Sequence, residues 1–375
     1  MNLIDLTKKI VSIPSYYDQN TDETELGNFI YDYFKTNITQ LSVKKQLCSN
    51  GNRFNVIASN SDDPKLVFSC HMDTVQPVGN TKDQFNVRVE GDKLYGLGAN
   101  DMKGGLSAAI SAAEDLQQNL PPLAIVFDYD EEYYFAGIID FLKRYKYKPK
   151  LALFTEPTDL RILNGCRGIT EIRFDVLGSS GHGSRPEEAV NAIQAGCELV
   201  KQLQFKLAQE KNMQIGATSV NFSSILGGRQ KDGDIVEQAN AVPDIARLLL
   251  DIRVSDKKVN AGYVKEQLEK LAKGLSLKIA NYKINLEIKP CFTREIDLQI
   301  VEKAMKKVIG KVSYQKELDK TGLFEGAFVK PKWNCPCLAF GPGPRNTEFT
   351  KDEYVSIKDL EKTKSVYKEI ICLMA

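Results

Sequence analysis

Short apolar runs, each followed at once by polar or glycine-rich residues, recur in the first part and near the end of the chain. Four of these runs are predicted to be buried strands: Lys65–Cys70, Ala124–Asp128, Leu151–Thr155 and Cys337–Phe340. Helical patterns at Asp22–Phe34 and Gly104–Leu116 alternate with them, and the first begins with a plausible Asp/Thr cap. This alternation predicts an α/β sheet sandwiched by helices.

The middle of the chain has a different pattern. Strands are predicted at Gly168–Leu177, Ser219–Leu226, Ala246–Val254 and Lys283–Lys289, and helices at Pro186–Leu207 and Asn260–Leu275. Gly227–Gly233 is expected to be the central hairpin or loop. The order β-α-β-β-α-β is that of a ferredoxin-like unit. We therefore expect residues 1–166 and 290–375 to form one discontinuous domain and residues 167–289 to be an inserted α+β domain, a division that suits a length of 375 residues.

Charge and composition give no reason to expect several classes of partner. The chain has 50 Lys+Arg and 49 Asp+Glu, so a net charge of +1 gives no electrostatic reason to expect nucleic acid or an anionic membrane. No apolar run approaches the ~20 residues of a membrane span, and the opening Met1–Asp5 lacks a signal-peptide core. Eight scattered cysteines are typical of reduced, buried thiols. We expect a cytoplasmic protein.

The polar residues that follow the predicted strands are the candidate chemistry, because sites in open α/β sheets form beyond the carboxyl ends of strands. His71 follows the first run, and His182 is the only other histidine. On a strand, His71 and Asp73 point to the same face, so Asp73 is placed to orient a liganding imidazole. Asp101 follows a glycine-rich loop at the start of a helix, where it could cap the helix or bind a metal.

Two acidic segments complete the set. Glu131 and Glu132 follow the second run and point different ways, which suits one base for water and one ligand; Glu156 follows the third run. Taken alone, the His71 motif is more typical of a hydrogen-bonded histidine at a strand end, and Asp101 of a helix cap. The acids at Glu131 and Glu132 are equally typical of a solvated loop, and Glu156 alone is weak evidence. Together, His71, Asp101, Glu132 and Glu156 supply the imidazole and carboxylate ligands of hydrolytic zinc.

At this point the chain resembles a known family, the M20 metallopeptidases, which include acetylornithine deacetylase, succinyl-diaminopimelate desuccinylase and carboxypeptidase G2-like enzymes. The matching motifs are S-C-H-M-D-T, G-L-G-A-N-D-M-K-G-G, D-E-E, E-P-T, G-H-G-S-R-P-x-x-A-V-N-A-I and N-A-V-P-D-x-A-x-x-x-x-D-I-R. The resemblance covers nearly the whole chain. It implies a zinc-dependent α/β/α catalytic domain with a ferredoxin-like dimerisation lid.

The resemblance also implies roles for individual residues. His71 and Glu156 would hold one zinc, Asp101 would bridge to a second, and Glu132 would ligate the second. Asp73 would orient His71, and Glu131 would be the general base. His182 would reach the partner subunit's site and stabilise the oxyanion. Asn240 and Arg253 would contact the substrate, since the planar fork of Arg253 suits a carboxylate.

One position departs from the family pattern. The family's last ligand is a histidine after a G-P-G turn, and Phe349 stands there after Gly341–Pro342–Gly343. The segment Thr321–Gly326 also departs from the usual G-x-T-D-A. Three outcomes are open: Glu348 substitutes as a carboxylate ligand, the enzyme works with one zinc held by His71, Asp101 and Glu156, or the site is inactive.

We therefore expect a cytoplasmic, homodimeric amidohydrolase with one or two zinc ions per subunit, for which cobalt could substitute. Its substrate would be an N-acyl amino acid, as in acetylornithine deacetylase or a desuccinylase of amino-acid biosynthesis, or a small peptide with a free carboxylate. The alternative, motivated by Phe349, is a catalytically impaired binding protein that keeps the fold.

Overall fold

The computed structural model describes residues 1–48, 51–79, 81–344, 347 and 350–375. These residues form two compact units. The first comprises Met1–Gly165, Thr293–Lys316 and Phe324–Ala375, and the second comprises Cys166–Phe292 and Glu317–Leu323. Within the described residues, no helix combines the length and the apolar character that crossing a membrane would require.

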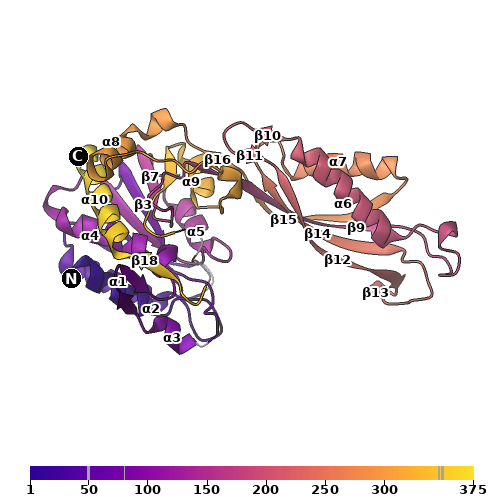
Figure 1. The fold of residues 1–375 in the computed structure, drawn as a ribbon, viewed down its shortest axis with the longest axis horizontal. Helices are drawn as coiled ribbons and strands as arrows, with labels where there is room; N and C mark the ends of the chain where they lie inside the picture. The colour runs from indigo at the N-terminus through magenta and orange to yellow at the C-terminus, as the bar shows by residue number, and fades with distance from the viewer. Residues whose placement is uncertain (49–50, 80, 345–346, 348–349) are drawn as a thin grey trace. The chain divides into compact units, whose positions relative to one another are not determined.

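A six-stranded sheet forms the centre of the first unit (Figure 1). Its strands, in spatial order, are β1 (Ser42–Leu47), β2 (Phe54–Ser59), β6 (Leu123–Asp128), β3 (Leu66–His71), β7 (Leu151–Phe154) and β17 (Cys337–Ala339). The last four are parallel, so their carboxyl ends lie along one edge of the sheet. These four are the strands predicted from the apolar runs, whereas β1 and β2 are additional and antiparallel.

Helices cover both faces of this sheet. One face packs against α1 (Leu3–Val11), α2 (Thr24–Asn37), α4 (Gly104–Asp115), α8 (Gln299–Ile309) and α10 (Ile357–Met374), whose apolar residues share one buried core with it. The other face packs against α5 (Ala136–Arg144) and α9 (Gly326–Trp333), where Phe141 meets Trp333 and Phe154 of β7 meets Phe324. The predicted α/β/α architecture is confirmed.

The chain also contains a small second sheet and several short elements. A three-stranded sheet consists of β4 (Arg88–Glu90), β5 (Lys93–Tyr95) and β18 (Tyr354–Ser356). The remaining short elements are α3 (Thr81–Phe85), β8 (Gly165–Cys166), β10 (Lys211–Asn212), β11 (Gly216–Ala217) and β16 (Cys291–Phe292). Helix α2 begins two residues later than predicted, and the Asp22 carboxylate accepts the Thr24 N–H at 2.8 Å.

The second unit has the ferredoxin-like order predicted for it. Along the chain its main elements are β9 (Gly168–Leu177), α6 (Ala192–Ala208), β12 (Ser219–Lys231), β13 (Asp234–Val236), β14 (Ile245–Val254), α7 (Ala261–Gly274) and β15 (Lys278–Ile288). They form an antiparallel sheet in the order β13-β12-β14-β9-β15, and α6 and α7 share its buried apolar core (Figure 1).

One prediction in this unit is wrong, and another is made more specific. The helix predicted from Pro186 begins at Ala192, because Pro186–Glu188 form a separate short turn and the Asn191 side chain caps α6. The hairpin or loop expected at Gly227–Gly233 is part of a hairpin, in which β12 continues through Lys231 and pairs with β13. Its turn consists of Asp232 and Gly233, whose φ values of 51° and 92° are those of a two-residue Asp-Gly turn.

Candidate active site

Side chains from three segments meet around His71 at the carboxyl edge of the parallel strands. His71 ends β3, and its Nε2 lies 3.2 Å from Asp101 Oδ1 and 3.9 Å from Glu156 Oε2. Asp101 lies in an irregular turn, Ala99–Lys103, before α4, and Glu156 follows β7. Ligand atoms of His71, Asp101 and Glu132 all lie within 4.8 Å of one another. The structure thus brings together the predicted ligand residues of this unit.

This group fits a divalent cation on grounds independent of the family. Imidazole and carboxylates are the donors that hydrolytic zinc uses. The Glu156 Oε1 atom is buried and has no hydrogen-bond partner, which is costly unless something positive meets it. A bound cation would supply that partner.

The backbone of Asp73 determines which nitrogen of His71 faces this group. His71 Nδ1 lies 3.0 Å from the Asp73 carbonyl oxygen, which can only accept a hydrogen bond. Nδ1 therefore donates to this carbonyl, and Nε2 is the nitrogen that faces Asp101. That nitrogen is the one a metal would bind.

The carboxylate of Asp73 has a second role. It lies 3.6 Å from His71 Nδ1, but its hydrogen bonds come from elsewhere: Oδ1 accepts the Glu131 N–H at 3.1 Å and Oδ2 accepts the Glu132 N–H at 3.0 Å. Asp73 is completely buried. Asp73 thus binds the His71 imidazole with its backbone carbonyl and binds the acidic loop, residues 130–132, with its carboxylate.

A partly buried arginine also holds the acidic loop, and sequence reasoning did not find it. Arg53 Nη1 donates to Asp130 Oδ1 at 2.9 Å, and Arg53 Nη2 lies 2.7 Å from Glu23 Oε1. The guanidinium also stacks on Tyr17 and Tyr129, 4.5 and 4.9 Å from their ring centroids. Asp130 needs this support because its φ is 69°, a left-handed conformation that is unfavourable for a residue with a side chain.

Crowding of acids governs the electrostatics of the site. Burial, and then the charges of Asp73, Asp101 and Asp128, raise the pKa of Glu131 to about 8. Burial and the neighbouring acids likewise raise the pKa values of Glu132 and Glu156 well above their usual range. For His71, burial lowers the pKa, but the hydrogen bond to Asp101 and the nearby carboxylates outweigh it, and the net shift is upward. A cation would relieve this repulsion.

A second group of acids lies beside the first, and it was also missed. Ser69 Oγ is 2.9 Å from Asp128 Oδ2 and 3.0 Å from Glu325 Oε2. A hydroxyl has one hydrogen to donate, so one of these carboxyl groups must be protonated. Burial raises the pKa of Asp128 to about 7 and raises that of Glu325 well above its usual range. Glu325 belongs to the segment whose sequence departs from the family pattern. Phe349 and Glu348 lie outside the described residues.

Glu353 holds the turn that carries Asp101. Its Oε1 accepts the N–H groups of Asn100 at 2.9 Å and Asp101 at 3.1 Å, and the side chain is buried. Because these two residues lie more than 250 positions apart from Glu353, only the folded chain brings them together.

Replacing Glu353 by alanine is expected to weaken metal binding. The change leaves the buried Asn100 and Asp101 N–H groups without an acceptor, at a cost of about 1–3 kcal/mol of unfolding free energy. A residue that supports a ligand affects metal affinity by roughly tenfold or more. Zinc affinity measured by competition with a chelator checks this. Glu353→Gln is the matched control, because it keeps an accepting oxygen and should lose less; equal affinity in all three proteins would contradict the assignment.

The acids also predict how the metal-free protein responds to pH. Because the pKa of Glu131 rises from 4.5 to about 8 on folding, the folded chain keeps a proton that the unfolded chain releases between these values. Stability therefore falls as the pH rises through this window. We expect the Tm of chelator-treated protein to be lower at about pH 8 than at about pH 5, and zinc to raise the Tm more at the higher pH. A Tm that rises with pH in chelator would contradict this.

The second unit carries the remaining predicted site residues, His182, Asn240 and Arg253. Arg253 lies apart from the other two. His182 pairs with Ala241, and Gly183 N–H donates to the Asn240 carbonyl at 2.8 Å, so His182 and Asn240 lie together ahead of β14. Arg253 lies near the far end of β14, where its Nε and Nη2 both donate to Asp251 Oδ2, at 3.1 and 3.0 Å.

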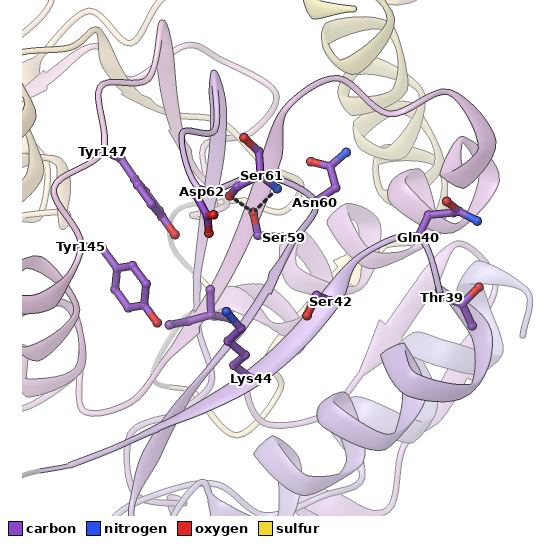
Figure 2. A pocket seen from close by; sticks show the side chains of 11 residues that line it. Thr39, Gln40, Ser42, Lys44, Ser59, Asn60, Ser61, Asp62, Tyr145 and Tyr147 are labelled. Atoms are coloured by element: carbon purple, nitrogen blue, oxygen red, sulfur yellow. Dashed lines mark hydrogen bonds between the residues drawn. The ribbon is translucent and has the colours of Figure 1, made fainter.

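A pocket elsewhere in the first unit is not part of this arrangement. It has a volume of about 380 Å³ and lies beside β1, with Ser42, Lys44, Tyr145 and Tyr147 among its lining residues (Figure 2). None of its lining residues is a predicted site residue. The pocket is therefore not part of the group around His71.

A protein-family model described as Peptidase family M20/M25/M40 matches residues 67–372. The chain belongs to this peptidase family. Among curated proteins, this M20 chain is 26% identical over 387 residues to acetylornithine deacetylase of Buchnera aphidicola subsp. Schizaphis graminum, covering 99% of this chain and 97% of that enzyme. It is 27% identical to acetylornithine deacetylase of Proteus mirabilis, covering 98% and 95%.

Solved structures agree on the fold of this M20 chain. Aminopeptidase PepT from Bacillus cereus superposes with a TM-score of 0.77 at 19% identity, covering 99% of this chain and 98% of that one. An M20 family metallo-carboxypeptidase from Sulfolobus solfataricus gives 0.74 at 17% identity, covering 100% and 99%. Family membership makes the protein a metal-dependent hydrolase of the M20 type.

Proposed function

We propose that this protein is a zinc-dependent hydrolase of the cytoplasm that cleaves the amide bond of an N-acyl amino acid, in the manner of acetylornithine deacetylase or a desuccinylase, or of a small peptide with a free carboxylate. One observation carries the proposal. Nε2 of His71 faces Asp101 within a group completed by Glu132, and Glu131 is held beside that group by Asp73. The acetylornithine deacetylases among the relatives support the substrate class.

In this proposal His71, Asp101, Glu132 and Glu156 hold the metal. Zinc in such a site polarises a carbonyl and makes water nucleophilic near neutral pH. Glu131 takes the proton of the attacking water and returns it to the leaving nitrogen. A base with a raised pKa suits both transfers, because it gives the proton back as readily as it takes it. His182 donates a hydrogen bond to the oxyanion that forms at the carbonyl.

The second unit supplies substrate contacts. Arg253 is partly exposed, and its guanidinium can bind a substrate carboxylate by two parallel hydrogen bonds. Asn240 would contact the substrate from beside His182. Asp251 holds the guanidinium of Arg253 through Nε and one N–H of Nη2, which leaves Nη1 and the second N–H of Nη2 for a ligand.

The separation of these residues favours a homodimer. Strand β14 has ten residues, so its ends are about 30 Å apart at roughly 3.3 Å per residue. His182 and Asn240 lie at one end and Arg253 at the other. One copy of the unit therefore cannot offer all three to one metal centre. We propose that a two-fold partner supplies His182 and Asn240.

Mixing two inactive variants tests this exchange. A mixed dimer of Glu131→Gln and His182→Ala chains contains one site in which both residues are intact. Unfolding and refolding an equal mixture should therefore restore about a quarter of wild-type activity, because random pairing makes half of the dimers mixed and half of their sites complete. Each variant refolded alone is the control. No recovery, with mixed dimers demonstrated by differential tagging, would contradict the shared site.

A substrate panel tests the proposed reaction. Release of acetate, succinate or free amino acid is measured with N-acetylornithine, N-succinyl-diaminopimelate and simple dipeptides. Turnover of an N-acyl amino acid ahead of the dipeptides is the expected result. Binding without turnover across the panel would favour the alternative motivated by Phe349, a non-catalytic binding protein with this fold.

A further inference from the structure

The loop of His182 is joined to the segment of Asn240 by backbone pairing within the second unit. Gly183 N–H donates to the Asn240 carbonyl and Val242 N–H donates to the Gly181 carbonyl, both at 2.8 Å. The two side chains belong to neighbouring, paired segments and are exposed. What each side chain offers to a ligand is determined by its own hydrogen-bond partners.

Ser184 determines the state of the His182 ring. The backbone N–H of Ser184 donates to His182 Nδ1 at 3.2 Å, and Ser184 Oγ lies 2.7 Å from the same nitrogen. A backbone N–H can only donate, so Nδ1 must be an acceptor. The neutral ring then carries its proton on Nε2 and presents an N–H to a ligand.

A relay that begins at Arg229 determines the orientation of Asn240. Arg229 Nη1 donates to Gln238 Oε1 at 3.0 Å, and Gln238 Nε2 donates to Asn240 Oδ1 at 3.0 Å. A guanidinium has no acceptor, so the oxygen of Gln238 must face Arg229 and its amide nitrogen must face Asn240. The Asn240 oxygen is thereby occupied, and its NH₂ group is left to donate.

We propose that Ser184 and Gln238 are positioning residues that present His182 and Asn240 as a pair of hydrogen-bond donors. A donor pair recognises an oxygen acceptor, such as the oxyanion or a carboxylate of the substrate, and rejects a cationic group. This inference rests on the proposed function, in which both residues contact substrate. It adds the two residues that make His182 and Asn240 donors. It predicts that both side chains offer only N–H groups to the substrate.

Nitrogen NMR of the imidazole rings tests the proposed role of Ser184. The chain has only two histidines, so a sample labelled with ¹⁵N in histidine gives two rings, and the spectrum of His182→Ala identifies the signals of His182. We expect a protonated Nε2 and a hydrogen-bonded, unprotonated Nδ1. Ser184→Ala should shift the Nδ1 signal of His182 alone and lower kcat roughly tenfold, the equivalent of one ordinary hydrogen bond, with little change in KM. Ser184→Thr should restore both, and Ser180→Ala in the same loop should change neither.

An isosteric substitution tests the proposed role of Gln238. In Gln238→Glu, the new carboxylate accepts from Arg229 and cannot donate, so Asn240 must turn its NH₂ inward and present its oxygen. We expect kcat/KM to fall roughly tenfold. Gln230→Glu adds the same charge on β12 and should leave kcat/KM unchanged.

The outcomes separate this inference from the proposed function. An unshifted Nδ1 signal in Ser184→Ala, a shifted signal with unchanged kcat, or equal effects of the two glutamine substitutions would overturn the positioning roles. Full turnover in His182→Ala would instead overturn the proposed role of His182, whatever its ring state.

Discussion

Replacing Glu131 by glutamine is expected to lower kcat by roughly 10³- to 10⁴-fold, the upper range for loss of a general base, while bound zinc stays unchanged. Glutamine preserves the shape of the side chain and the backbone N–H that Asp73 Oδ1 accepts. It removes only the ability to take a proton. Because His71, Asp101 and Glu132 form the ligand group without Glu131, the metal should stay. Steady-state kinetics check the fall in kcat, and elemental analysis of the same preparation checks the zinc content.

The neighbouring acid is the matched control for this prediction. Glu132→Gln changes the same charge one residue away, but it removes a proposed ligand and should lower the metal content. If Glu131→Gln lost metal and Glu132→Gln kept it, the two roles would have to be exchanged. Near-wild-type turnover in Glu131→Gln would remove the base assignment altogether.

Replacing Asp73 by asparagine is expected to lower kcat/KM by roughly 100-fold, at the upper end for residues that support a metal site. Each carboxylate oxygen accepts one backbone N–H of the acidic loop, from Glu131 and from Glu132. An asparagine amide can satisfy only one of them and turns an NH₂ group towards the other. The loop must then move, and the base and one ligand move with it.

The tautomer of His71 in Asp73→Asn shows whether the Asp73 carboxylate acts mainly on the acidic loop or on the imidazole. Its Nδ1 bonds to the backbone carbonyl of Asp73, which asparagine keeps. We therefore expect the ¹⁵N signals of His71 in Asp73→Asn to show the same protonated Nδ1 as in the wild type. Loss of that tautomer, with Glu131 and Glu132 still in place, would mean that the carboxylate acts mainly on the imidazole.

Sequence reasoning could predict the parallel strands and the residues that follow them. Strands β3, β6 and β7 are almost wholly buried, so their sequences are continuous apolar runs that end where polar residues begin. The position of His71, Asp101, Glu132 and Glu156 along one edge follows from that topology. Strand β1 was missed because it is mostly exposed and its residues are largely polar.

The long-range contacts that hold the site in place could not be predicted in the same way. Asp73 reaches Glu131 across 58 positions, Arg53 reaches Asp130 across 77, and Ser69 reaches Glu325 across 256. Such contacts depend on tertiary packing and leave no local pattern. The separation of Asn240, ahead of β14, from Arg253, near the far end of that strand, could have been predicted, because strand length alone separates them.

Zinc bound per chain, measured by elemental mass spectrometry after reconstitution and gel filtration, tests the central claim most directly. The account predicts one or two zinc ions per chain in the wild type, none in His71→Ala, and turnover that a chelator removes and added zinc restores. A wild-type chain that retains no zinc would contradict it, because the buried acids around His71 would then lack the cation that explains them.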